Sequence, residues 1–172
     1  MHVISGSALL ILFLIVTLPG TAMAESPPSY SGTYELDEEA SDDLMEAFEP
    51  AVKEMSRFKR PFARRTIRRE SGPEAKLRIQ KNDEMLIIEA HEDFRVPLNG
   101  EPVDHEDNDG DIVQMSAWID DGVLMVRTEM DDGEYTTEYR LSPDGKQLSA
   151  LTRIDVEQLP KRVDYLIVYI RQ

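Results

Sequence analysis

Turn signals recur at short, regular intervals through the second half of the sequence, and they constrain the fold more than any other feature. Glycine supplies the positive φ that tight hairpins require, and Asn or Asp before it tolerates the same backbone. From residue 81 onward the signals are Lys81-Asn82-Asp83, Asn99-Gly100, Asn108-Asp109-Gly110, Asp120-Asp121-Gly122, Asp131-Asp132-Gly133 and Pro143-Asp144-Gly145. Short segments bounded by such turns indicate antiparallel strands joined by hairpins.

The segments between these turns have the length and the alternation of strands. Leu124, Val126 and Thr128 alternate with Arg127 and Glu129, which is the period of two expected when a sheet buries one face. We expect strands in segments 30–37, 76–80, 84–90, 93–98, 111–119, 122–130, 133–141, 146–154 and 162–171. Their regular spacing predicts an antiparallel meander, either a barrel or a sandwich.

One segment between the first expected strand and the meander has helical periodicity. Ser41 is the expected N-cap, because Asp42 and Asp43 after it suit the positive end of a helix dipole. The apolar stripe consists of Leu44, Phe48, Val52, Met55 and Phe58. Pro50 interrupts it, which leaves either two short helices, with Pro50 opening the second, or one kinked helix. We expect this helical lid to span residues 41–59.

The N-terminal segment has the pattern of a secretory signal peptide. The first 24 residues contain no Asp, Glu, Lys or Arg, and Ala8 to Leu18 is an almost unbroken apolar run. Pro19-Gly20 and Ala22-Met23-Ala24 follow it, as a helix break and a small-residue cleavage site would. An uncleaved anchor is the alternative, although the run is short for a bilayer span of about 20 residues. We expect residues 1–24 to be a signal peptide, residues 25–172 to form one domain, and the protein to be periplasmic or secreted.

Composition argues against several classes of function. With 34 acidic and 19 basic residues the net charge is -15, so the chain as a whole repels nucleic acid. It has no Cys and no G-x-S-x-G motif, which removes the usual nucleophiles. His91 and His105 lack a clear third zinc ligand, and the acidic segment 104–111 fails the spacing of a calcium-binding EF-hand loop. We therefore expect no metal, no cofactor and no enzymatic activity.

The order of strand, helical pair and eight or nine further strands resembles that of the intracellular lipid-binding proteins, which share the calycin superfamily with the lipocalins. "SGTYELD" (31–37) resembles their opening Gly-Thr-Trp strand, with Tyr34 in place of Trp. "GEYTTEYRLSPDGKQL" (133–148) is similar to a late hairpin in which Thr-Thr precedes a ligand-binding arginine, here Arg140. "YLIVYIR" (165–171) resembles the closing strand with its Arg-x-Tyr pair; Tyr169 matches, but Ile167 stands in the arginine's position.

This resemblance implies an all-β, antiparallel, up-and-down lipocalin-like barrel with a helical insertion after the first strand, of an exported bacterial type. The isoleucine at position 167 weakens the implied binding of fatty acids, because a buried carboxylate needs charge-assisted partners. Strand parity does not decide whether Arg140 faces the interior of the barrel or water. This residue lies on the opposite face from Tyr135, Tyr139 and their neighbours, so it faces water if the aromatic face is the interior.

Aromatic side chains mark the expected ligand cavity, since tyrosines combine an apolar ring with a polar handle. The candidate ligand-binding residues are Trp118, Arg140, Tyr165 and Tyr169. The leading hypothesis is an exported, non-enzymatic protein that binds a small apolar or amphipathic molecule. The alternative is that these side chains fill a small barrel completely.

The segment "RFKRPFARRTIRR" (57–69) contains seven basic residues and no acidic one. One interpretation is a patch on the rim of the barrel that docks to an anionic membrane surface or an acidic protein, with interleaved aromatics as apolar contacts. The candidate residues are Arg60, Arg64, Arg65, Arg68 and Arg69. The other interpretation is that the patch pairs with acidic groups of the same chain. A filled barrel with this docking patch would be an interaction module rather than a carrier.

Overall fold

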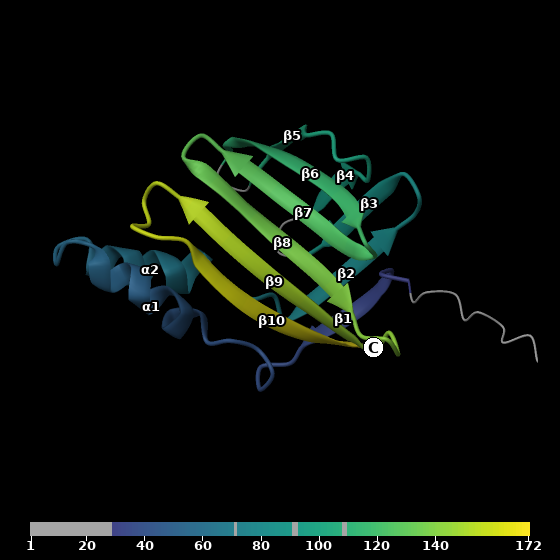
Figure 1. Ribbon diagram of the computed structural model, residues 1–172, viewed down its shortest axis with the longest axis horizontal. Helices are drawn as coiled ribbons and strands as arrows, with labels where there is room; N and C mark the ends of the chain where they lie inside the picture. Colours follow the sequence, from purple (N-terminus) through teal and green to yellow (C-terminus); the bar gives the residue numbers. More distant parts are fainter. Residues whose placement is uncertain (1–28, 71, 91–92, 108–109) are drawn as a thin grey trace, which may run out of the picture.

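The computed structural model describes residues 29–70, 72–90, 93–107 and 110–172 (Figure 1). The expected signal peptide at residues 1–24 lies outside this part of the chain. Within it, no helix is both long enough and apolar enough to span a bilayer.

Ten strands form one antiparallel sheet. They are β1 (Gly32–Leu36), β2 (Lys76–Lys81), β3 (Met85–Glu89), β4 (Phe94–Pro97), β5 (Val103–Glu106), β6 (Ile112–Asp120), β7 (Val123–Met130), β8 (Gly133–Leu141), β9 (Gln147–Val156) and β10 (Val163–Arg171). Their order in the sheet is β4-β3-β2-β1-β10-β9-β8-β7-β6-β5. The sheet rolls into a nearly closed barrel with two helices inserted after the first strand, which confirms the predicted fold (Figure 1). The short strand β5 was not predicted.

Alternation along the strands sets the inside of the barrel. On β7, Leu124, Val126 and Thr128 are buried, whereas Met125 and Arg127 between them are partly exposed. The end of the barrel near the β6–β7 turn is closed by Tyr30, whose hydroxyl lies 2.7 Å from the carbonyl oxygen of Gly122. The same hydroxyl accepts a hydrogen bond from the backbone N–H of Leu124 at 3.2 Å.

The two helices pack side by side at one end of the barrel, next to β10 (Figure 1). Helix α1 spans Leu44–Glu54, and its N-cap is Asp43, not Ser41 as predicted. The Asp43 carboxylate accepts from the N–H groups of Met45 and Glu46 at 2.7 and 3.2 Å. Ser41 instead accepts from the N–H of Val168 at 2.9 Å and so links this segment to β10.

Pro50 lies inside α1, and the helix continues to Glu54. Of the two alternatives for Pro50, the one in which it opens a second helix is therefore wrong. The second helix, α2, spans Arg60–Glu70, so most of the Arg-rich segment is helical. The helices extend over residues 44–70, beyond the expected limit at residue 59.

Candidate functional site

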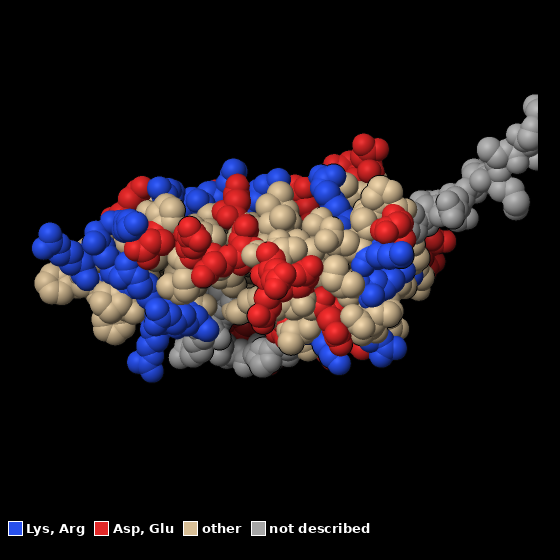
Figure 2. All heavy atoms as spheres, turned by 90° about the horizontal axis from the view of Figure 1, so that it is seen from below, with Lys and Arg blue, Asp and Glu red and all other residues tan. Residues whose placement is uncertain are grey.

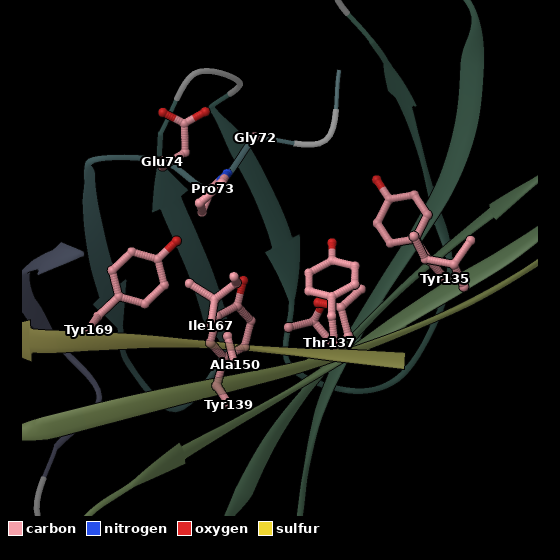
Figure 3. A pocket seen from close by; sticks show the side chains of 12 residues that line it. Gly72, Pro73, Glu74, Tyr135, Thr137, Tyr139, Ala150, Ile167 and Tyr169 are labelled. Atoms are coloured by element: carbon pink, nitrogen blue, oxygen red, sulfur yellow. The ribbon is translucent and has the colours of Figure 1, made fainter. Parts of the chain in front are cut away.

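A cavity of about 350 Å³ lies inside the barrel against β8, β9 and β10. Each of these strands contributes alternate, inward-facing side chains, and the connection between α2 and β2 lies across from them (Figure 3). The lining residues are Gly72, Pro73, Glu74, Tyr135, Thr137, Tyr139, Ala150, Thr152, Ile154, Tyr165, Ile167 and Tyr169. We call this space the tyrosine cavity.

A second cavity, of about 280 Å³, lies on the side of β4 to β7. It is lined by Ala90, Phe94, His105, Asp107, Val113, Met115, Val126, Thr128 and Met130, together with four residues of the tyrosine cavity. The shared residues are Glu74, Tyr135, Thr137 and Tyr139. The two cavities therefore have a common wall. We call the second space the β7 cavity.

Hydroxyl groups are the main polar feature of the tyrosine cavity. The hydroxyl oxygens of Thr137 and Thr152 lie 2.9 Å apart, and Tyr165 is hydrogen-bonded to Thr152. Burial raises the pKa of Tyr169 to about 12, and the charge of Glu74 acts in the same direction. Burial also raises the pKa of Tyr139. These phenols therefore stay neutral at physiological pH, able both to donate and to accept.

Two predicted site residues are in this cavity and two are not. Tyr165 and Tyr169 line it, as expected. Trp118 lies on the opposite face of β6 from Ala117, which is fully buried in the core. Arg140 lies on the outside of β8, where its guanidinium donates to the Glu138 carboxylate at 2.9 Å. The expectation that Trp118 and Arg140 line the cavity is corrected by the parity of their strands.

The Arg-rich segment divides into arginines that hold the helices together and arginines that face solvent. Arg60 donates to the carbonyl oxygens of Lys53 and Met55 at the end of α1, at 2.5 and 3.1 Å. Arg64 forms an ion pair with Glu49 of α1. Arg65 and Arg68 are exposed, and the side chain of Arg69 lies outside the described part of the chain. Figure 2 shows blue side chains gathered at the helical end of the molecule.

Sequence patterns did not predict a groove of about 780 Å³ between the helices and the ends of β7, β8 and β9. Its lining is mainly apolar: Phe48, Met55, Phe62, Ala63 and Ile67 from the helices, and Met130, Tyr135, Ile154, Val156 and Leu159 from the barrel. Tyr135 lines this groove and both cavities. It therefore stands between the groove and the interior.

Glu74 and Tyr135 were the important residues missed by sequence reasoning. Tyr135 shares a strand face with Thr137 and Tyr139, so the alternation of β8 contained a signal for it. Glu74 lies in the connection before β2, where neither periodicity nor a motif marks one acidic residue among the 34 of the chain.

Comparison with known proteins supports the fold. No family model matches the sequence, and no curated protein gives a significant match. Among solved structures, a secretary abundant heat soluble (SAHS) protein from Ramazzottius varieornatus superposes with a TM-score of 0.60 at 14% identity, over 84% of this chain and 96% of that one. Zebrafish ileal bile acid-binding protein complexed with cholic acid gives 0.54 at 11% identity, over 83% and 98%.

Fatty-acid-binding protein 1 of Echinococcus granulosus gives a TM-score of 0.51 at 13% identity, over 83% of this chain and 96% of that one. Like the other two, it matches nearly its whole length. At such low identities the likeness concerns the arrangement of the elements. The chain thus has the barrel fold of the fatty-acid-binding proteins, with its helical pair in the same place in the chain order.

Proposed function

We propose that this protein binds one small apolar or amphipathic molecule inside its barrel. The observation that carries the proposal is the pair of cavities that share Tyr135, Thr137 and Tyr139 as a wall. The tyrosine cavity, at about 350 Å³, exceeds the volume of about 300 Å³ at which small-molecule pockets start. The β7 cavity beside it adds about 280 Å³. The mixture of apolar side chains and a few hydroxyls is also typical of such sites.

The solved neighbours are consistent with this proposal. One was determined with cholic acid bound, and another is named as a fatty-acid-binding protein. We further propose that the molecule enters through the groove between α2 and β8, because Tyr135 is the wall shared by the groove and the cavities. Rotation of one tyrosine side chain is a small movement for opening such a path.

We also propose that the protein acts as a carrier rather than an enzyme, and that it is exported to the periplasm or secreted. The first statement is supported by a cavity lined mainly by neutral phenols, hydroxyls and alkyl groups. The second is supported only by the sequence pattern of residues 1–24.

Binding of the neutral dye Nile red, with and without a cavity-filling substitution, tests the carrier function. Ala150 is buried and lines the tyrosine cavity, so Ala150→Phe should reduce the affinity for the dye at least tenfold. Ser149→Phe is the matched control, because its side chain points to the other face of the same strand. Circular dichroism and thermal melting establish that both variants fold. Equal dye binding by folded Ala150→Phe and the wild type would contradict the proposal.

A second candidate function is docking to an anionic membrane surface. The specific observation is that Phe58 and Phe62 are 89% and 74% exposed, next to the exposed basic residues Lys59, Arg65 and Arg68. Aromatic side chains flanked by cations suit the headgroup region of anionic bilayers. Sedimentation with phosphatidylglycerol vesicles should be salt-sensitive and should be lost in Arg65→Glu/Arg68→Glu. Equal binding to phosphatidylcholine vesicles would contradict this candidate.

A further inference from the structure

We propose that the barrel selects amphipathic molecules whose polar end is an uncharged or cationic hydrogen-bond donor, an alcohol or an amine, and disfavours anions such as carboxylates. This inference rests on the proposed binding function and specifies the chemical class of its ligand. It follows from the charges and the hydrogen-bonding groups around the two cavities.

The first step concerns positive charge. Among the described residues that line the two cavities there is no Lys or Arg. Glu74 lines both cavities, and Asp107 lines the β7 cavity. A carboxylate that leaves water for this space would lose its hydration and would meet the like charge of Glu74 without a Lys or Arg to pair with. The basic side chain among these residues, His105, lies in the β7 cavity together with Asp107. Anionic ligands are therefore disfavoured.

The second step concerns the arginines of the neighbouring strands, which are bound elsewhere. Both Arg140 and Arg153 donate to Glu138 on the outer face of the barrel. Arg171, on the inward face of β10, donates to the hydroxyl of Tyr34 at 2.6 Å and lies over its ring. Tyr34 in turn donates to the carbonyl oxygen of Tyr30, so this arginine belongs to the closed end of the barrel.

The third step concerns a buried hydroxyl group in the wall of the β7 cavity. Thr128 is 1% exposed and lines the β7 cavity. Its hydroxyl oxygen is buried and has no hydrogen-bond partner among the residues that the structure describes. An unsatisfied buried hydroxyl raises the free energy of the folded protein. A ligand group that hydrogen-bonds to Thr128 removes this cost, and the ligand binds more tightly for that reason. Thr128 therefore provides a polar anchor inside an otherwise apolar wall of Val126, Met115 and Met130.

The fourth step concerns Glu74, which is the acceptor at the edge of both cavities. Figure 3 shows Glu74 on the connection before β2, on the side toward which the hydroxyl of Tyr169 points. An ionised carboxylate only accepts hydrogen bonds, so it favours an O–H or N–H donor over another acceptor. The charge of Glu74 already affects this space, since it contributes to the raised pKa of Tyr169. A ligand with its donor near Glu74 and Thr128 would place its tail against Ala150 and Ile167.

Three probes with the same tail test the inference on the full chain: oleyl alcohol, oleylamine and oleate, each held below its aggregation concentration and used to displace Nile red. We expect the alcohol and the amine to displace the dye at concentrations at least tenfold lower than oleate. Glu74→Gln should reduce the ratio of amine affinity to oleate affinity at least threefold. Thr128→Val should weaken the binding of the alcohol. Glu101→Gln is the control, because Glu101 is exposed on the connection between β4 and β5.

The outcomes separate the inference from the function on which it rests. If oleate competes as well as the alcohol, the inference is overturned while the carrier function remains. The same holds if Glu74→Gln, although folded, leaves the amine-to-oleate ratio unchanged. If the wild-type protein does not bind Nile red or any of the three probes, the carrier function fails and the inference fails with it.

Discussion

The guanidinium of Arg64 donates two hydrogen bonds to the carboxylate of Glu49, from Nε to Oε2 at 3.1 Å and from Nη2 to Oε1 at 2.7 Å. This bidentate pair joins α2 to α1. The geometry explains why an arginine rather than a lysine suits this position, because only the planar guanidinium matches both carboxylate oxygens. Part of the Arg-rich segment therefore serves the chain's own helical pair rather than a partner.

The Arg64–Glu49 pair should make the helical pair sensitive to acid. The hydrogen bond from Arg64 holds the pKa of Glu49 below its usual value of 4.5. A depressed pKa in the folded state means that the pair stabilises the helices above that value and ceases to do so as the pH falls through the lowered pKa. Hydrogen exchange of residues 44–70 should thus be faster in Arg64→Gln than in the wild type near neutral pH, and the difference should shrink as the pH falls through the lowered pKa of Glu49.

Arg65→Gln is the control for this measurement, since Arg65 is exposed on the same helix. A difference between Arg64→Gln and the wild type that persists unchanged at acid pH would show that Arg64 acts through packing rather than through the ion pair.

Removal of the N-cap should weaken α1. Because the Asp43 carboxylate satisfies the N–H groups of Met45 and Glu46, Asp43→Ala should lower the free energy of unfolding by about 1 kcal/mol in urea denaturation. Asp43→Asn retains a capping oxygen, so its free energy of unfolding should fall much less. Equal losses in the two variants would mean that charge, and not capping, is the contribution of Asp43.

Gly133 should not accept a side chain. Its φ is +148°, and a Cβ there would lie 2.3 Å from the carbonyl oxygen of Asp155 and 2.6 Å from the Cα of Val156. Both are backbone atoms of the paired strand β9, so they cannot rotate away. We expect Gly133→Ala to lower the free energy of unfolding by about 1–3 kcal/mol more than the strained backbone conformation alone would explain.

Gly122→Ala supplies the comparison for Gly133. Gly122 also has a positive φ, of +77°, but no atom lies within 4 Å of the position where its Cβ would be. It should lose about 1 kcal/mol, from backbone strain alone. Thermal or urea unfolding of the two variants measures the difference, and equal losses would refute the steric explanation.

Arg140 should contribute to stability but not to binding. Glu138 is 11% exposed in its side chain and accepts from Arg140 and Arg153 on the outer face of the barrel. We expect Glu138→Gln to lower the free energy of unfolding by about 1–2 kcal/mol, because two charged hydrogen bonds lose their anion. The exposed Arg140 should cost less than about 1 kcal/mol when changed to Gln, with unchanged affinity for Nile red. Weaker dye binding by folded Arg140→Gln would contradict its position outside the cavity.

The barrel itself was predictable because its signals are local. Turns such as Asp120-Asp121-Gly122 combine a residue with positive φ and a glycine, and Asp121 and Gly122 do have φ values of +46° and +77°. Parity placed Tyr165 and Tyr169 on one face of β10, but Val168 on the other face is buried as well, so their inward position followed from the choice of aromatic side chains as cavity markers. The orientation of Arg140 was left undecided, because strand parity separates the two faces of β8 but does not say which face is inside the barrel.

Other features depended on tertiary structure. Helix α2 is strongly basic and has few apolar residues, and Ile67 is the one buried hydrophobic side chain among those of α2 that the structure describes; its sequence therefore gives a weaker sign of a core-facing helix than that of α1. Strand β5 begins with Val103 and continues through Asp104, His105 and Glu106; it exists because β6 provides a partner along its length. Trp118 was predicted to face the barrel interior, but the inward-facing residue at this point of β6 is its small neighbour Ala117.

The sheet has two ends, β4 and β5, and among the described residues no ladder joins one to the other. The connection between these strands is fixed instead to the next strand along, by the bond from the N–H of Gly100 to the carbonyl oxygen of Ala117 at 2.9 Å. The barrel is therefore joined at this one place by a connection and not by a strand ladder. We expect any change in the circumference of the barrel to fall at this seam, because fewer backbone hydrogen bonds would break there than between two paired strands.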